Sequence, residues 1–211
     1  MSRPPSGVRA DQKFSYRTLE TYACKVRECL NLRPTAALDP LDLFENLDNI
    51  SIRLRDGKMV PFRSGVVALE DSEGYARYDR SQNVLEILAS ESTYHWLEIG
   101  NPRATYFVAH ELGHCILHTD QLVRLAQMPT QQQKAFHRGR ADHSPCEDTE
   151  WQANAFASAL LMPACGIRAL EEENSCLTAP LITAIFAVSQ EAAGYRLDLY
   201  NKRRNELLTS I

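Results

Sequence analysis

The stretch Tyr106-Phe107-Val108-Ala109-His110-Glu111-Leu112-Gly113-His114-Cys115-Ile116-Leu117 places two histidines four positions apart inside an apolar segment. On an α-helix, residues four apart lie on one face, with Cβ atoms about 5–6 Å from each other. The imidazoles of His110 and His114 can therefore share one metal ion. Glu111 follows the first of them and can accept a proton from a water bound to the same ion. Two nitrogen ligands and one carboxylate base predict a zinc site of the peptidase type.

The residues around this motif favour a helix. Asn101-Pro102 offers an N-cap residue followed by a proline at the first helical position. Apolar residues then recur at helical spacing, at Ala104, Phe107, Val108, Leu112, Cys115 and Ile116. We expect a buried helix of about seventeen residues. The alternative to a metal site is the same helix with two buried core histidines and a surface glutamate.

Composition limits the classes of protein to consider. The chain has 211 residues, 44% hydrophobic and 24% charged, which is typical of one compact globular domain or one domain with a small appendage. A net charge of -4 gives no overall basic field to attract nucleic acid. Apolar stretches are interrupted before the roughly eighteen residues of a membrane span. The six cysteines show no Cys-x-x-Cys spacing, and residues 1–7 do not lead into a signal sequence, so we expect reduced thiols in a cytoplasmic protein.

The pattern along the chain predicts an α+β fold. Residues 15–30 form an amphipathic helix and Asp39-Pro40 opens a short one, whereas 50–90 reads as a small antiparallel β-meander. Helical patterns return at 149–161, 167–173, 181–186 and 191–208. We divide the chain into a flexible N-terminal tail (1–14), a metallopeptidase domain (15–165) with a long polar flap (119–149), and a C-terminal helical region (166–211).

A catalytic zinc needs a third protein ligand, and two histidines with one glutamate are a common set. His118 lies eight residues beyond His110, about 12 Å along a straight helix, so one ion cannot reach both. We expect His118 to pack in the core or to form a supporting hydrogen bond. The other downstream candidates are His137, His143, Cys146, Glu147, Asp148 and Glu150.

Glu150 begins the second long helix and shares a face with Ala153, Asn154 and Ala157. The small alanines would let this helix approach another backbone closely, and Asn154 could then brace a ligand or a substrate group. An acid in the first turn is also favoured by the helix dipole, a role that Glu147 and Asp148 could serve equally. Spacing alone therefore leaves the choice among these acids open.

Two blocks of the sequence resemble one family. Residues 103–118, Arg-Ala-Thr-Tyr-Phe-Val-Ala-His-Glu-Leu-Gly-His-Cys-Ile-Leu-His, resemble the active-site helix of the ImmA/IrrE-type metallopeptidases. Residues 150–157, followed by Leu-Leu-Met-Pro at 160–163, resemble the family's Glu-x-x-Ala-Asn-x-Phe-Ala segment. Both blocks in this order are more specific than His-Glu-x-x-His alone. A weaker resemblance covers most of residues 15–200.

The resemblance implies a zincin-like helical core with His110, His114 and Glu150 as metal ligands and Glu111 as general base. It implies Zn²⁺ as the cofactor, although Mn²⁺ or Fe²⁺ also suits two histidines and one carboxylate. It further implies regulatory proteolysis of a protein substrate, a DNA-binding repressor. The long polar connection between His118 and Glu150 departs from the family pattern.

The sequence also offers candidates for a second oxyanion donor and for a substrate-binding strand. Tyr94, His95, Arg103 or His143 could supply a second donor to the oxyanion that forms during peptide hydrolysis. If Val84–Leu88 is an exposed sheet edge beside the motif helix, a substrate could bind there as an added strand.

Two alternative functions use the same elements. Residues 181–197 resemble a helix-turn-helix, which would suggest a DNA-binding regulator. Residues 181–211 carry four basic and three acidic side chains, a net of +1, which is a weak footprint for phosphate binding. The second alternative is a non-catalytic antirepressor that binds its partner without cutting it.

Overall fold

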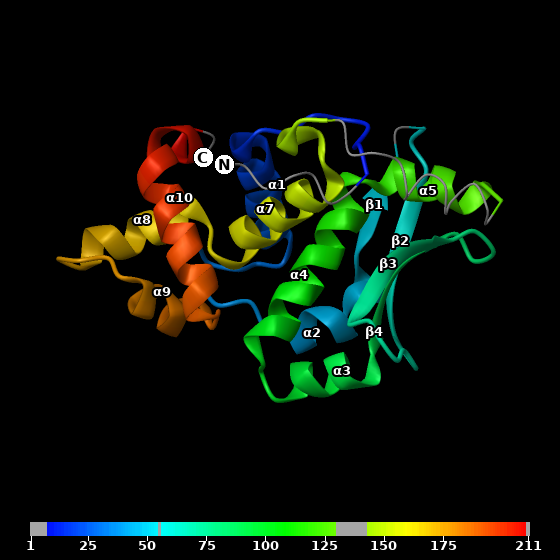
Figure 1. Ribbon diagram of the computed structural model, residues 1–211, viewed down its shortest axis with the longest axis horizontal. Helices are drawn as coiled ribbons and strands as arrows, with labels where there is room; N and C mark the ends of the chain where they lie inside the picture. The colour runs from blue at the N-terminus through cyan, green and yellow to red at the C-terminus, as the bar shows by residue number, and fades with distance from the viewer. Residues whose placement is uncertain (1–7, 55, 130–142, 210–211) are drawn as a thin grey trace.

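The computed structural model describes residues 8–54, 56–129 and 143–209, and it confirms the α+β class. Figure 1 shows how the elements are arranged. In chain order they are α1 (Tyr16–Cys29), α2 (Pro40–Glu45), η1 (Leu47–Asn49), β1 (Ser51–Arg53), β2 (Met59–Val67), β3 (Gly74–Asp79), β4 (Val84–Ser90), α3 (Glu91–Glu98), α4 (Pro102–Leu117), α5 (Thr119–Gln127), η2 (Pro145–Glu147), α7 (Thr149–Leu161), α8 (Ala164–Glu173), α9 (Ala179–Phe186) and α10 (Gln190–Leu208).

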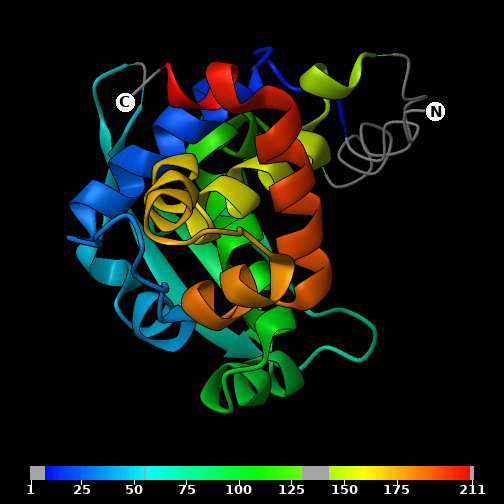
Figure 2. The same cartoon turned by 90° about the vertical axis from the view of Figure 1, so that its left-hand side faces the viewer.

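The helix that carries the motif lies at the centre of the molecule. One side of α4 packs on the sheet and the other on α7, and α8, α9 and α10 lie beyond α7 (Figure 1). In the view turned by 90°, α8 to α10 are in front and the sheet lies behind them (Figure 2). One continuous apolar core runs through all these layers, from Leu85 in the sheet to Phe186 and Tyr200 in the C-terminal helices.

The sheet differs from the predicted antiparallel meander. Its strand order is β1-β2-β4-β3, and β2 runs parallel to β4, while β3 pairs antiparallel with β4 and forms the edge. The reason lies in β4, whose seven residues are all buried, and a strand buried on both faces belongs inside a sheet. Its one charged side chain, Glu86, is neutralised across the sheet by Arg63 and Arg77. The expectation that Val84–Leu88 forms an exposed edge is therefore wrong.

The motif helix begins where the sequence predicts. The Asn101 side chain accepts a hydrogen bond from the Arg103 N–H, and Pro102 occupies the first turn. The helix continues for 16 residues to Leu117. It buries Ala104, Phe107, Val108, Leu112 and Cys115, so the predicted apolar spacing corresponds to a buried face.

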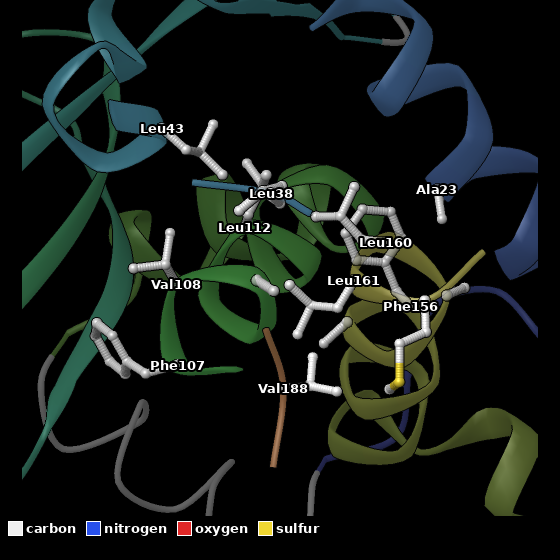
Figure 3. Close-up of a cluster of buried hydrophobic side chains, with 14 of the residues drawn as sticks. Ala23, Leu38, Leu43, Phe107, Val108, Leu112, Phe156, Leu160, Leu161 and Val188 are labelled. Atoms are coloured by element: carbon white, nitrogen blue, oxygen red, sulfur yellow. The ribbon is translucent and has the colours of Figure 1, made fainter. Parts of the chain in front are cut away.

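The contact of α4 with α7 is unusually close at one point. A Cβ atom added to Gly113 would lie 3.0 Å from Cδ1 of Phe156 and 3.3 Å from both Cα and the carbonyl oxygen of Ala153. Figure 3 shows the apolar side chains beside this contact, with Leu112 on α4 facing Phe156 and Leu160 on α7. Glycine and alanine therefore set the distance between the two helices.

The structure describes only part of the expected N-terminal tail and part of the expected flap. Residues 8–14 are held to the segment before α7: the Ala10 N–H donates to the Glu147 carbonyl at 2.7 Å, and the Thr149 N–H donates to the Val8 carbonyl at 3.0 Å. Within the expected flap, residues 119–127 form α5 and 145–147 form η2. Residues 1–7 and 130–142, which include His137, lie outside the described residues.

A buried ion pair fixes the junction between α7 and α8. An Arg196 guanidinium nitrogen donates to both carboxylate oxygens of Glu20, at 2.9 and 2.7 Å, and Arg196 Nε donates to the Met162 carbonyl at 2.8 Å. The same carboxylate accepts the Ala164 N–H at 2.6 Å. Both charged side chains are only 1% exposed, so each neutralises the other inside the core.

By length and hydropathy, the stretch Thr149–Glu173 resembles a membrane span, which the sequence analysis did not anticipate. It consists of two helices, α7 and α8, separated at Met162-Pro163. Of its most apolar window, 67% is buried inside the fold, as expected for core helices.

We predict that Gly113→Val reduces the free energy of unfolding by about 1–3 kcal/mol more than Gly194→Val does, because added carbon atoms overpack the α4–α7 contact. Gly194 is the matched control, since it also lies in a helix and a Cβ there meets nothing within 4 Å. Urea denaturation of both variants measures the difference. Equal losses would show that the close contact does not constrain the fold.

We also predict that Arg196→Met destabilises the protein by about 3–5 kcal/mol, because it leaves a buried carboxylate without its partner. Arg204 lies on the same helix and pairs with Glu171 at the surface, with its side chain 47% exposed. Arg204→Met should therefore cost less than about 1 kcal/mol. Chemical denaturation of the two variants checks this contrast, and similar small losses would contradict it.

Candidate metal centre

Three side chains expected to bind metal converge between α4 and α7. Nε2 of His110 lies 3.0 Å from Nε2 of His114, and the Glu150 carboxylate oxygens lie 3.3 and 3.2 Å from these two nitrogens. Four ligands around zinc at about 2.0–2.1 Å would be separated from one another by ~3.3 Å. The two imidazole nitrogens and the carboxylate therefore fit a zinc ion in both chemistry and spacing. Among the described residues, they are the one such group of three potential ligands.

The geometry of each helix places these ligands. His110 and His114 are one turn apart on α4, and Glu150 lies in the first turn of α7. The side chain of Asp148 caps α7 by accepting the Trp151 N–H at 2.9 Å. The capped first turn of α7 then presents Glu150 toward α4.

The other described candidates for the third ligand make different contacts. His143 Nε2 lies 3.0 Å from Asp148, and both side chains are almost fully buried. Glu147 accepts the Ser144 hydroxyl hydrogen bond at 2.6 Å and pairs with Arg9. Cys146 Sγ lies 3.3 Å from the Ser144 hydroxyl. The structure thus brings Glu150, and not these neighbours, next to the two histidines.

A hydrogen-bond network orients His110. The Asn154 side-chain oxygen lies 3.0 Å from Nδ1 of His110 and accepts its proton, which directs Nε2 toward the metal centre. The Tyr106 hydroxyl donates to the same oxygen at 3.1 Å and lies 3.2 Å from the Asn154 carbonyl. Burial raises the pKa of Tyr106 to about 12, so the hydroxyl keeps its proton at neutral pH. The sequence analysis did not single out Tyr106, although it lies one turn before His110.

His118 supports the site from the other end of α4. Its side chain is buried, and Nε2 donates to the Thr149 carbonyl at 3.3 Å, immediately before Glu150. Burial lowers the pKa of His118 to about 4, so its ring is neutral at physiological pH. Its contact matches the supporting role expected from its spacing.

Glu111 projects toward the same centre from the side of the edge strand. Burial raises the pKa of Glu111, although His114, His110 and the Ala76 backbone N–H, which donates to the carboxylate, oppose this shift. A carboxylate with a raised pKa is a better proton acceptor than an exposed one. The hydrogen bond from Ala76 on β3 holds the carboxylate between the sheet edge and the histidines.

The three potential ligands influence one another's protonation. Hydrogen bonds from His110 and His114 hold the pKa of Glu150 well below its usual range. Burial by itself lowers the pKa of His110, but the hydrogen bond to Glu150 and the charges of Glu111 and Glu150 outweigh it, and the net shift is upward. The acidic groups beside His110 thus favour a positive charge at this position.

A cleft of about 860 Å³ opens beside the site. His110, Glu111 and Asn154 lie on its inner side, and the C-terminal helices supply Ser189, Glu191, Ala192 and Tyr195. A second hollow of about 340 Å³ shares His110 and Glu111 and extends past His114 and Glu150 along Tyr75 and Ala76. The candidate site is thus open on both sides of the ligand cluster.

The four candidates for a second oxyanion donor lie in different places. Tyr94 donates to Glu45 at 2.7 Å, and His95 Nδ1 lies 3.4 Å from Glu98. His143 is buried against Asp148. Arg103 lines the large cleft and pairs with Glu73. Of these four, Arg103 alone reaches the cleft, where Tyr106 also lies.

The structure is an α+β fold in which two histidines and one glutamate could hold a metal ion. Residues 101–198, from the cap of α4 into α10, match the family model described as the IrrE N-terminal-like domain, Peptidase_M78. This match confirms the family resemblance seen in the sequence.

Comparison with solved structures identifies a Mycobacterium tuberculosis transcriptional regulator that is 21% identical in sequence, with a TM-score of 0.47. The match covers 85% of this chain and 55% of that protein, so the chain spans little more than half of the regulator's length. No curated protein matches the chain.

We predict that Asn154→Ala weakens zinc binding by about 10–100-fold, because His110 loses the acceptor that orients it. Asn154→Asp should retain most of the affinity, since a carboxylate oxygen can accept the same proton. Competition with a fluorescent zinc chelator measures both. Unchanged affinity in Asn154→Ala would show that this hydrogen bond does not position the ligand.

Proposed function

We propose that this chain is a zinc-dependent endopeptidase of the cytoplasm that cleaves a regulatory protein such as a DNA-binding repressor. The observation that carries the proposal is the convergence of His110, His114 and Glu150 beside the buried carboxylate of Glu111. The match of residues 101–198 to the M78 peptidase family model supports the reaction type. The repressor substrate rests on the family resemblance in the sequence.

The two imidazoles and the Glu150 carboxylate would hold the ion. Zinc, when bound, supplies a Lewis acid that polarises a water and the scissile carbonyl. Zn²⁺ is favoured by these ligands, and Mn²⁺ or Fe²⁺ are the alternatives. Asn154 keeps His110 in the tautomer whose Nε2 is free to bind the ion.

Glu111 performs the proton transfers in this proposal. Its carboxylate takes a proton from the attacking water and later delivers it to the leaving amine, as a general base and then a general acid. Burial favours this cycle because it raises the pKa of Glu111 toward the working pH. The hydrogen bond from the Ala76 N–H keeps the carboxylate directed toward the cleft during both proton transfers.

The edge of the sheet offers a place for the substrate backbone. Strand β3, and not β4, has a free edge, and the hollow at the ligand cluster runs along its Tyr75 and Ala76. A peptide in extended conformation could add to β3 through main-chain hydrogen bonds, with its scissile bond beside Glu111. This mode suits an unfolded or flexible segment of a protein substrate.

The paired charges of α10 argue against the DNA-binding alternative. Arg196 is buried with Glu20, Arg203 pairs with Glu206 at 2.8 Å, and Arg204 pairs with Glu171 at 2.7 Å. Three of the four basic residues counted in this region are therefore neutralised by acids. The start of α10 also lines the large cleft, which favours a role in shaping the peptidase site.

We predict that Glu111→Gln binds zinc as the unmodified chain does but loses proteolysis by about 10²-fold or more, because it removes general acid–base catalysis. A peptide mixture from a digested proteome serves as substrate, and mass spectrometry detects new termini. Glu172→Gln, at an exposed ion pair with Arg168, is the matched control. Retained cleavage by Glu111→Gln would overturn the assigned role.

Two measurements separate the peptidase from the antirepressor alternative. Elemental analysis should find about one equivalent of zinc in the unmodified chain and a loss in Glu150→Ala. Incubation with a repressor encoded beside it should give fragments that disappear when a chelator is added. A stable complex without fragments would instead indicate a binding protein.

A further inference from the structure

Two cysteines meet where α1 packs against the start of α8, away from the metal ligands. One turn of α1 places Glu20 beside the first residue of α8, where its carboxylate accepts the Ala164 N–H at 2.6 Å. The next turn of α1 places Cys24 beside the following residue, Cys165, and the two thiols form a side-chain hydrogen bond. Helix packing therefore holds both sulfur atoms together, and neither forms a disulfide in this structure.

Cys165 can be reached from solvent. It is half-buried and lines a surface hollow of about 250 Å³ together with Arg168, Ala169, Glu172 and Leu208. Cys24 is half-buried next to it. By contrast, Cys115 is fully buried in α4, whereas Cys29 and Cys176 are exposed. The pair thus combines access for a small molecule with an adjacent partner thiol.

The surroundings of Cys165 favour its ionised form over that of Cys24. The hydrogen bond from Cys24 lowers the pKa of Cys165, burial and the Glu20 charge oppose this, and the Gly166 N–H and the Arg27 charge add to the lowering. The same hydrogen bond raises the pKa of Cys24, against the opposing charge of Arg196. These surroundings favour ionisation of Cys165 over ionisation of Cys24.

We propose that Cys165 and Cys24 form a peroxide-reactive site in which Cys165 is the attacking thiolate and Cys24 is the resolving thiol. The oxidant is a small hydroperoxide, of which hydrogen peroxide is the simplest. Large oxidants are disfavoured because the hollow beside Cys165 is small.

The chemistry proceeds in two balanced steps. The Cys165 thiolate attacks one peroxide oxygen, the O–O bond breaks, and the leaving hydroxide takes a proton to become water, which leaves a sulfenic acid on Cys165. Cys24 sulfur then attacks the Cys165 sulfur, the S–O bond breaks, and the thiol proton leaves with the hydroxyl as a second water. The two thiols are oxidised to one disulfide, and one peroxide is reduced to two waters.

The consequence for the fold is a covalent link between α1 and the α7–α8 junction. The buried pair of Glu20 and Arg196 already joins these elements, since it also holds the Met162 carbonyl. The disulfide would reinforce the same contact when the surroundings become oxidising.

The test uses the reduced full-length chain and a low molar excess of hydrogen peroxide at neutral pH. Peptide mapping by mass spectrometry should find a Cys24–Cys165 disulfide before Cys29 or Cys176 is modified. In Cys24→Ser, a sulfenic acid should accumulate on Cys165 and be trapped by dimedone. Cys29→Ser, on the same helix as Cys24, is the matched control and should form the disulfide normally.

A second measurement does not depend on disulfide geometry. The rate at which iodoacetamide alkylates Cys165 should rise with pH around a midpoint below the usual value for a thiol, about 8.5. The proposal is overturned if Cys29 and Cys176 oxidise first while Cys24 and Cys165 remain thiols, or if the midpoint for Cys165 lies at or above the usual value. Neither readout involves zinc or proteolysis, so this result and that of the proposed function are independent.

Discussion

The close approach of α4 and α7 at Gly113 and Ala153 is the constraint on which the candidate site depends. Histidines one turn apart can supply two ligands from a single helix, but the third must come from a separate element. A larger residue at Gly113 would crowd Phe156 and the Ala153 backbone, in the helix that carries Glu150. Neither small residue has any chemistry of its own, yet both set the distance between the helices and with it the spacing of the three potential ligands.

Around this contact, each polar group of the site has a partner that fixes its direction. Asn154 orients His110, His118 is bonded to the residue before Glu150, and the Ala76 N–H holds Glu111. Hydrogen bonds from His110 and His114 lower the pKa of Glu150 and outweigh its burial, whereas burial dominates at Glu111 and raises the pKa of that carboxyl. Two carboxylates in one site therefore differ in proton affinity, one suited to binding a cation and the other to exchanging protons.

Local sequence signals predicted the local structure well. The capping residues Asn101 and Pro102 predicted where α4 begins, and the four-residue spacing predicted that His110 and His114 lie side by side. The proximity of Glu150 did not follow from spacing, because it depends on how two helices distant in sequence dock. The sequence does contain a sign that β4 lies between β2 and β3. Apart from Glu86, residues 84–89 are apolar on both faces of the strand, as expected for a strand inside a sheet and not at its edge. Tyr106 was missed because its role depends on a contact with α7.

The free edge of β3 has one more consequence. An unpaired strand edge binds any chain in extended conformation, including another copy of the same protein, and so it favours self-association and aggregation. Here β3 is only six residues long, carries Arg77 and Asp79, and has α5 packed beside it, with Leu122, Leu125 and Ala126 facing its second half. These features confine the accessible part of the edge to a short stretch of backbone next to Glu111, which limits the length of sheet that another copy could extend.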